Sequence, residues 1–249
     1  MRRLALWLLG CVPLAAGAAG NPRVPEIGCP MSSDAASVQS RLPESMAAPV
    51  QSALVERLVY YRPAHGAGVF GPKGWFCRAW SGSGGDLVLV TPRPVAPPFV
   101  PLPEVTGPAV LLQSTDGSDV GRFHLALVAD RLFPLLGHDV IERVRDEHLI
   151  PDSSFDAEPY ADDRLQYLSD RLVEYTTPAN RPGLGTDSLL EASELPIRGV
   201  TLLKPEVPAT ALTELRVRLP ATEQALEDAI LDLETRCLQL RHGCRGLDD

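Results

Sequence analysis

The stretch that most constrains this chain is residues 71–92, GPKGWFCRAWSGSGGDLVLVTP. Two runs of β-branched and aromatic residues, 75–80 and 87–91, flank a link of glycine and serine at 81–85. Such runs favour strands, and glycine can adopt the positive φ angles that a tight reversal requires. The pattern predicts a central β-hairpin, which is an element of the fold and does not specify a reaction.

Apolar periodicity predicts four helices in the rest of the chain. The first spans residues 49–62 between two prolines, and a pair follows at 120–136 and 138–149. The last helix carries an apolar stripe formed by Leu226, Ile230, Leu233, Cys237 and Leu240.

β-prone runs predict further strands at 109–113, 172–176, 197–203 and 215–219. Because strand candidates come in adjacent groups and not in strict alternation with helices, we expect a single α+β domain over residues 21–249. Its sheet should be antiparallel or mixed, with about five or six strands and about four helices. We expect two irregular segments, an extended lead-in at 21–48 and a proline-rich connection at 92–108.

Residues 1–20 have the three zones of a secretory signal peptide: Arg2 and Arg3, an apolar run at 4–16, and small residues up to Gly20. A lipobox at 8–11, which would attach lipid to Cys11, is the alternative interpretation. Beyond the leader no apolar run is long enough for a membrane helix. We therefore expect a periplasmic or secreted protein, with a lipid anchor through Cys11 as the less favoured alternative.

Four cysteines follow the leader: Cys29, Cys77, Cys237 and Cys244. Disulfides are typical of exported proteins, and four cysteines allow three pairings. We predict that Cys29 pairs with Cys77, which would staple the N-terminal segment to the hairpin. Cys237 would then pair with Cys244 and fix the end of the last helix. Zinc is the alternative, but the spacing contains neither a C-x-x-C motif nor paired histidines.

The net charge argues against two classes of partner. The chain carries −9, and −11 once the leader with its two arginines is removed. A field of this sign repels phosphate backbones and anionic lipid surfaces. We therefore expect no nucleic-acid partner, and an envelope or extracellular partner instead.

The hairpin contains two kinds of candidate site. Ser81 and Ser83 lie among glycines, but SGSGG departs from the GxSxG nucleophile motif and precedes a strand where that motif needs a helix, so we interpret it as a turn. Trp75 and Trp80 could contact a sugar or a peptide. Alternation places them on opposite faces of a strand, so one should belong to the core and the other could contact a ligand.

Outside the hairpin, several residues could bind a metal or transfer protons. His138 and Glu142 share a helix face, but a solvated polar edge explains them better than a metal centre. His148 fits a boundary position and His124 belongs to no motif. Calcium could be bound by the acidic residues of the loop at 151–163, although their spacing matches no EF-hand: Asp152, Asp156, Glu158, Asp162 and Asp163. We predict no catalytic residue, cofactor or metal.

Five segments together resemble a set of exported bacterial proteins that have no assigned activity. They are GPKGWFC at 71–77, the SGSGG link, VEYTTPAN at 173–180, GLGT at 183–186 and PIRGV at 196–200. The resemblance implies an envelope or secreted setting and one continuous domain, and it brings no catalytic residues. We expect a non-enzymatic binding or structural module. The alternative is a hydrolase acting on cell-wall or extracellular material, with acids and histidines brought together by folding.

Overall fold

The computed structural model describes residues 21–31, 45–95, 104–117, 119–155, 161–205, 210–240 and 243–247. The expected α+β class is confirmed, because this part of the chain contains four α-helices and two β-sheets of seven and four strands. The predicted signal peptide and the middle of the proline-rich connection lie outside the described residues. None of the helices within them combines the length and apolar character that a membrane crossing requires.

The larger sheet is antiparallel, with the strand order β5-β6-β7-β11-β10-β9-β8. Its strands are β5 (Phe76–Gly82), β6 (Gly85–Thr91), β7 (Ala109–Asp116), β8 (Arg164–Ser169), β9 (Leu172–Thr177), β10 (Ile197–Lys204) and β11 (Ala211–Arg218). The four runs predicted beyond the hairpin are confirmed as β7, β9, β10 and β11. β11 begins earlier than predicted. It is the middle strand of the seven and is hydrogen-bonded to β7 on one side and to β10 on the other.

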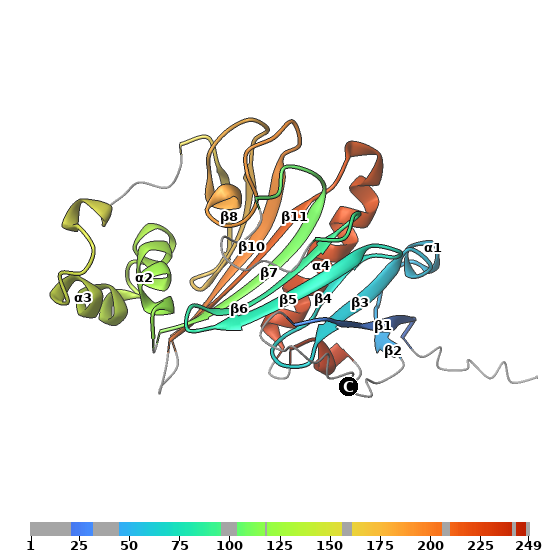
Figure 1. The fold of residues 1–249 in the computed structure, drawn as a ribbon, viewed down its shortest axis with the longest axis horizontal. Coiled ribbons are helices and arrows are strands. Elements are labelled where there is room, and N and C mark those ends of the chain that lie inside the picture. Colours follow the sequence, from blue (N-terminus) through green and yellow to red (C-terminus); the bar gives the residue numbers. More distant parts are fainter. Residues whose placement is uncertain are drawn as a thin grey trace, which may run out of the picture.

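The smaller sheet has the order β2-β1-β3-β4 and lies beside the larger one (Figure 1). Its strands are β1 (Arg23–Cys29), β2 (Ser45–Ala47), β3 (Leu58–Pro63) and β4 (Val69–Pro72). β1 and β3 pair in parallel, and the other pairs are antiparallel. The expected extended lead-in at 21–48 is therefore partly organised, because β1 and β2 hydrogen-bond as strands.

The helices occupy two sides of the larger sheet. α4 (Gln224–Gln239) contacts β10 and β11 of the larger sheet and β4 of the smaller one, so it joins the two sheets. α2 (Gly121–Leu132) and α3 (His138–Asp146) pack together near the opposite end of the molecule (Figure 1). These three helices confirm the predicted ones, whereas α1 (Ser52–Val55) is a single turn.

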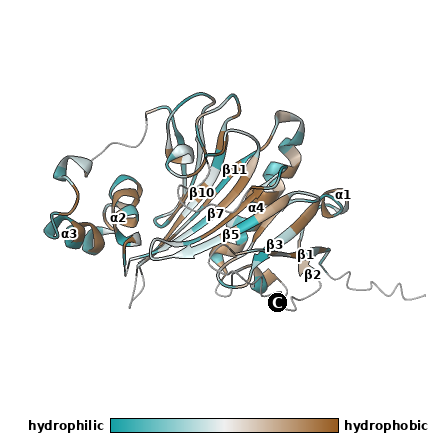
Figure 2. Cartoon of the chain, viewed as in Figure 1, coloured by the Kyte–Doolittle hydropathy of each residue, from teal (hydrophilic) through white to brown (hydrophobic). Residues whose placement is uncertain are grey.

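Alternation along the strands of the larger sheet places apolar residues on both of its faces, with one apolar cluster on the first face and two on the second. On one face, Val110, Leu112 and Leu215 pack with α4 and the smaller sheet. On the other, Leu203 and Leu212 pack with α2 and α3. Figure 2 shows hydrophobic residues along the strands of both sheets and on parts of the helices.

The predicted helix at 49–62 is wrong beyond its first turn. α1 ends at Val55, and Leu58–Pro63 forms strand β3, whose side chains are buried except at Arg62. The apolar residues at four-residue intervals resembled a helical stripe, but the run Leu58-Val59-Tyr60-Tyr61 is β-prone and both of its faces are covered. A strand buried on both faces lacks the alternation that would have identified it.

The predicted hairpin is confirmed as β5 and β6, but it lies at one edge of the larger sheet and not at its centre, and its turn is shorter than predicted. Gly82 pairs with Gly85, so the reversal consists of Ser83 and Gly84, and the strands extend into the expected link. Gly85 has φ of 117°, and a Cβ atom there would lie 2.1 Å from the carbonyl oxygen of Ser114 on β7. Only glycine fits this position.

Both predicted disulfides are confirmed. Cys29 and Cys77, with Cα atoms 5.4 Å apart, join β1 of the smaller sheet to β5 at the edge of the larger one. Cys237 and Cys244 join the end of α4 to the 3₁₀ turn Gly243–Leu247. The stretch 71–92 therefore belongs to both sheets and is covalently tied to the N-terminal segment.

Candidate functional site

A cleft of about 490 Å³ opens between the two sheets beside α4. We call it the inter-sheet cleft. Its apolar lining comes from Met46, Leu112 and Leu238, and hydroxyl groups come from β7 and β11 through Ser114 and Thr213. The volume is in the range of small-molecule sites, which combine apolar walls with a few polar groups.

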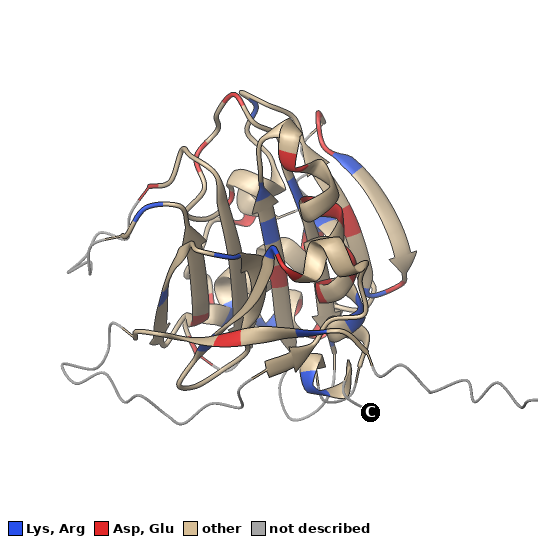
Figure 3. Cartoon of the chain, turned by 90° about the vertical axis from the view of Figure 1, so that its right-hand side faces the viewer, with Lys and Arg blue, Asp and Glu red and all other residues tan. Residues whose placement is uncertain are grey.

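Three basic residues line the inter-sheet cleft: Arg62, Lys204 and Arg245. Arg62 Nη1 lies 3.3 Å from Glu26 Oε2, so its charge is compensated. Lys204 and Arg245 have no ion-pair partner among the residues that the structure describes. Elsewhere, acidic and basic residues are interspersed, as the side view in Figure 3 shows. Among the described residues, the cleft thus holds two positive charges without an ion-pair partner, in a chain of net charge −9.

Glu234 of α4 also lines the cleft and is buried. Its Oε1 accepts a hydrogen bond of 2.6 Å from the backbone N–H of Phe70, which ties α4 to β4. Burial raises the pKa of Glu234 to about 8, although that hydrogen bond favours the carboxylate. Glu234 is therefore mainly protonated and uncharged near neutral pH.

Replacing Glu234 by glutamine is expected to make the protein less sensitive to alkaline pH. An unfolded glutamate ionises near pH 4.5, whereas the folded one keeps its proton up to about pH 8. Its contribution to the free energy of unfolding is therefore full below pH 4.5 and is lost as the pH rises towards 8. Urea unfolding at pH 5 and pH 9 should show a smaller loss for Glu234→Gln than for the wild type.

The matched control is Glu194→Gln, which changes an exposed acid. It should leave the pH profile of the wild type unchanged. Identical pH profiles for Glu234→Gln and the wild type would contradict the proposed burial of a protonated carboxyl group.

Glu234, Cys237 and Cys244 form a compact group, with one potential ligand atom from each lying within 4.8 Å of the others. A carboxylate and two thiolates could bind zinc. Both sulfur atoms are joined in the disulfide, however, and zinc binds cysteine as the thiolate. This group is therefore not a zinc site while the disulfide is intact.

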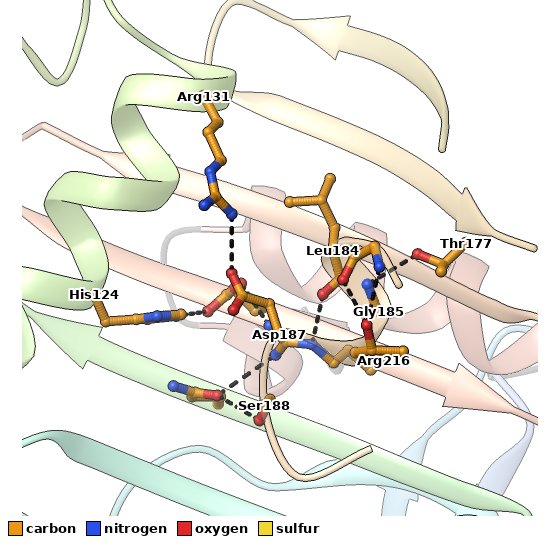
Figure 4. A network of polar contacts seen from close by, with 12 residues as sticks. His124, Arg131, Thr177, Leu184, Gly185, Asp187, Ser188 and Arg216 are labelled. Atoms are coloured by element: carbon orange, nitrogen blue, oxygen red, sulfur yellow. Dashed lines mark hydrogen bonds and ion pairs between the residues drawn. The ribbon is translucent and has the colours of Figure 1, made fainter. Parts of the chain in front are cut away.

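A second polar cluster lies on the opposite face of the larger sheet (Figure 4). Glu214 of β11 contacts two basic side chains: its Oε2 lies 2.6 Å from His124 Nε2, and its Oε1 accepts a hydrogen bond of 2.8 Å from Arg216 Nη2. Burial by itself raises the pKa of Glu214, but the charges of Arg216 and His124 outweigh it and lower the pKa to about 2. Burial lowers the pKa of His124, and Glu214 more than reverses this, so the net shift is upward.

The loop at 183–190 closes over this cluster (Figure 4). Arg216 Nε donates to the carbonyl oxygen of Leu184 at 3.2 Å, and Arg131 of α2 lies 3.2 Å from Asp187. Ser188 Oγ donates to Gln113 Oε1 at 3.1 Å. The cluster thus connects α2, β7, β11 and the loop, and most of its hydrogen-bonding groups are used internally.

The two tryptophans are both half-buried, and they pack against different cores. Trp75 contacts the core shared with α4, and Trp80 contacts a smaller cluster on the other face of the larger sheet, which contains Leu89 and Leu111. The two residues thus contact opposite faces of the larger sheet, but Trp75 precedes β5, and neither tryptophan is the buried core residue that we expected one of them to be. Trp75 also lines a groove of about 550 Å³ with several prolines, while the hairpin's most exposed aromatic residue is Phe76, at 49%. Ligand contact by either tryptophan stays a prediction.

The other candidates are not brought together. His138 and Glu142 are exposed on α3, and Glu142 lies 3.6 Å from Arg145, which fits the expected polar edge. His148 is not at a boundary as we expected; it follows the end of α3, is exposed, and has φ of 52°. Ser81 and Ser83 are exposed residues of the hairpin.

The acidic loop does not assemble a calcium site from its described members. Asp162 lies 3.6 Å from Arg181, whereas Asp163 accepts a hydrogen bond of 2.8 Å from the N–H of Leu184. Asp152 is exposed in a short 3₁₀ turn. Asp156 and Glu158 lie outside the described residues.

No protein-family model matches this chain, and the searches of curated proteins and of solved structures also found no match. The resemblance to exported bacterial proteins stays a prediction. Functional conclusions therefore depend on the residues themselves.

The sequence-based prediction missed the inter-sheet cleft, although one signal was present. Glu234 lies four residues after Ile230 and three before Cys237, so it belongs to the apolar stripe of α4. An acid within such a stripe indicates a buried carboxyl group. Lys204 is the last residue of β10 and Arg245 lies in the 3₁₀ turn Gly243–Leu247, and neither position carried a comparable signal in the sequence.

Proposed function

We propose that this protein is an exported, non-enzymatic binding module and that the inter-sheet cleft is its ligand site. One observation carries the proposal: a cleft of about 490 Å³ combines apolar walls, a buried carboxyl group and two cations that have no ion-pair partner within the described part of the chain. Convergence of a few polar groups in an apolar pocket is typical of ligand sites. The two disulfides are compatible with the predicted export.

The disulfides also support this use of the cleft. Cys237–Cys244 fixes the 3₁₀ turn that carries Arg245, and Cys29–Cys77 holds β1 and with it the smaller sheet that forms one wall. Rigid walls lower the entropy lost on binding. A binding site enclosed by cross-linked elements is therefore pre-organised for its ligand.

A hydrolase has weaker support. His124 is 27% exposed and contacts Glu214, as a general base contacts the carboxylate that orients it. Glu214 is shared with Arg216, however, and Ser188 in the same cluster donates to Gln113. The cluster thus contains a histidine–glutamate pair, but among the described residues no hydroxyl or thiol group is hydrogen-bonded to His124 as a nucleophile would be.

The test is a fragment screen by ¹H–¹⁵N NMR on protein recovered from the periplasm or medium of the producing cells. We expect fragments to shift backbone signals around Tyr60, Ser114 and Thr213. Thr213→Phe, on β11, should block the cleft and abolish these shifts. The control Thr176→Phe, on β9, lies on the same face of the larger sheet but outside the cleft and should preserve them. Shifts that survive Thr213→Phe would contradict the site, and an intact Met1 form with free thiols inside the cell would contradict export.

A further inference from the structure

We infer that the inter-sheet cleft binds small amphipathic organic anions, with the carboxylate or phosphate of the ligand between Lys204 and Arg245 and its apolar part against Leu238 and Ala67. This inference rests on the proposed function and specifies its ligand class. It follows from the charges and the apolar surface that face the cleft.

The charges around the cleft favour an anion. Arg62 is neutralised by Glu26, so Lys204 and Arg245 provide the net positive charge. Among the acids, Asp86 lies near Gly66 at the edge of the cleft, and Glu234 is deep inside it. Since Glu234 holds its proton near neutral pH, its carboxyl group does not cancel the two cations. An anionic head group would supply the missing negative charge.

The apolar residues that line the cleft indicate that the ligand also has an apolar part. Of the apolar residues that line the cleft, Leu238 of α4 is half-buried and Ala67 is exposed, whereas Met46 and Leu112 belong to the buried core. Water gains little from hydrogen bonding against the side chains of Leu238 and Ala67, and a hydrocarbon chain would release it. A purely polar anion would leave this surface exposed to water.

Proton binding at Glu234 should tune the affinity. Above about pH 8 Glu234 becomes a carboxylate, which repels a second anion in the same cleft. Binding of an organic anion should therefore weaken between pH 7 and pH 9 in the wild type. Glu234→Gln should remove this part of the pH dependence, while titration of Tyr60 does not contribute, because burial raises the pKa of its hydroxyl far above this range.

The chain has only two lysines, Lys73 and Lys204, which makes a direct test possible. Reductive ¹³C-methylation keeps the positive charge and gives each lysine its own NMR signal. Four probes of equal chain length are titrated: octanoate, octyl phosphate, octan-1-ol and octylamine. We expect the two anions to shift the signal of Lys204 and leave that of Lys73 unchanged.

Calorimetry on two matched variants gives the second measurement. Lys204→Met should weaken octanoate binding about tenfold, the effect of losing one charged hydrogen bond, and Lys73→Met should not change it. Equal or tighter binding of octan-1-ol or octylamine in the cleft would overturn the ligand class and leave the binding site intact. If no probe of any charge perturbs cleft signals, the ligand class and the proposed function both fail.

Discussion

Glu214→Gln is expected to destabilise the protein by about 3–5 kcal/mol, because it leaves the charge of Arg216 buried without a carboxylate. Both side chains are almost fully buried on the middle strand of the larger sheet, and the two charges compensate each other at 2.8 Å. The measurement is urea unfolding at neutral pH. The matched control is Asp232→Ala, which removes the acid of the exposed pair Asp232–Arg236 on α4 and should cost about 0.5 kcal/mol.

The double variant Glu214→Leu/Arg216→Met tests whether the pair acts as a unit. The double variant leaves no buried ion without a partner. Its loss of unfolding free energy should therefore be smaller than the sum of the losses measured for Glu214→Leu and Arg216→Met alone. Some cost should remain, because Arg216 also donates to the carbonyl oxygen of Leu184. Strictly additive costs would show that the two residues are not coupled.

Removing the Cys29–Cys77 disulfide by a double serine substitution is expected to cost about 4 kcal/mol, and removing Cys237–Cys244 about 2.5 kcal/mol. The first closes a loop with a sequence separation of 48 and the second a loop of 7, so the first restricts the unfolded chain more. The two variants are compared by urea unfolding of the oxidised proteins. The wild type with its disulfides reduced serves as the reference for losing both.

The order of the two costs is the decisive outcome. If the Cys237–Cys244 variant were the less stable of the two, loop closure would not be the main contribution. In that case the packing of the 3₁₀ turn against α4 would matter more, since Cys244 and Leu247 of this turn belong to the core beside Glu234.

Much of the larger sheet could be predicted from local sequence. The hairpin of β5 and β6 followed from two β-prone runs and a glycine-rich link, and α2, α3 and α4 followed from their apolar stripes. These signals are local, because strand and helix periodicities are properties of a few consecutive residues. Both disulfides were also predicted, from the two pairs of elements that they would join.

The smaller sheet was not predicted, for a physical reason that β3 illustrates. Its residues are buried on both faces, so it lacks alternation, and its parallel partner β1 lies about thirty residues earlier in the chain. β8 was missed for the opposite reason, since most of its side chains are exposed at the edge of the larger sheet. The inter-sheet cleft depends on the smaller sheet and was therefore missed with it.

Strand β11 shows how far local periodicity reaches and where long-range packing takes over. Alternation in ALTELRVR determined that Glu214, Arg216 and Arg218 share one face of a strand, which by itself suggests a solvent-exposed face. The structure covers this face with α2 and with segments near residues 105–107 and 183–191, and Arg218 donates there to the carbonyl oxygens of Val105, Gly107 and Glu191. Periodicity assigns residues to a face, but only contacts with distant segments decide whether water or protein covers it.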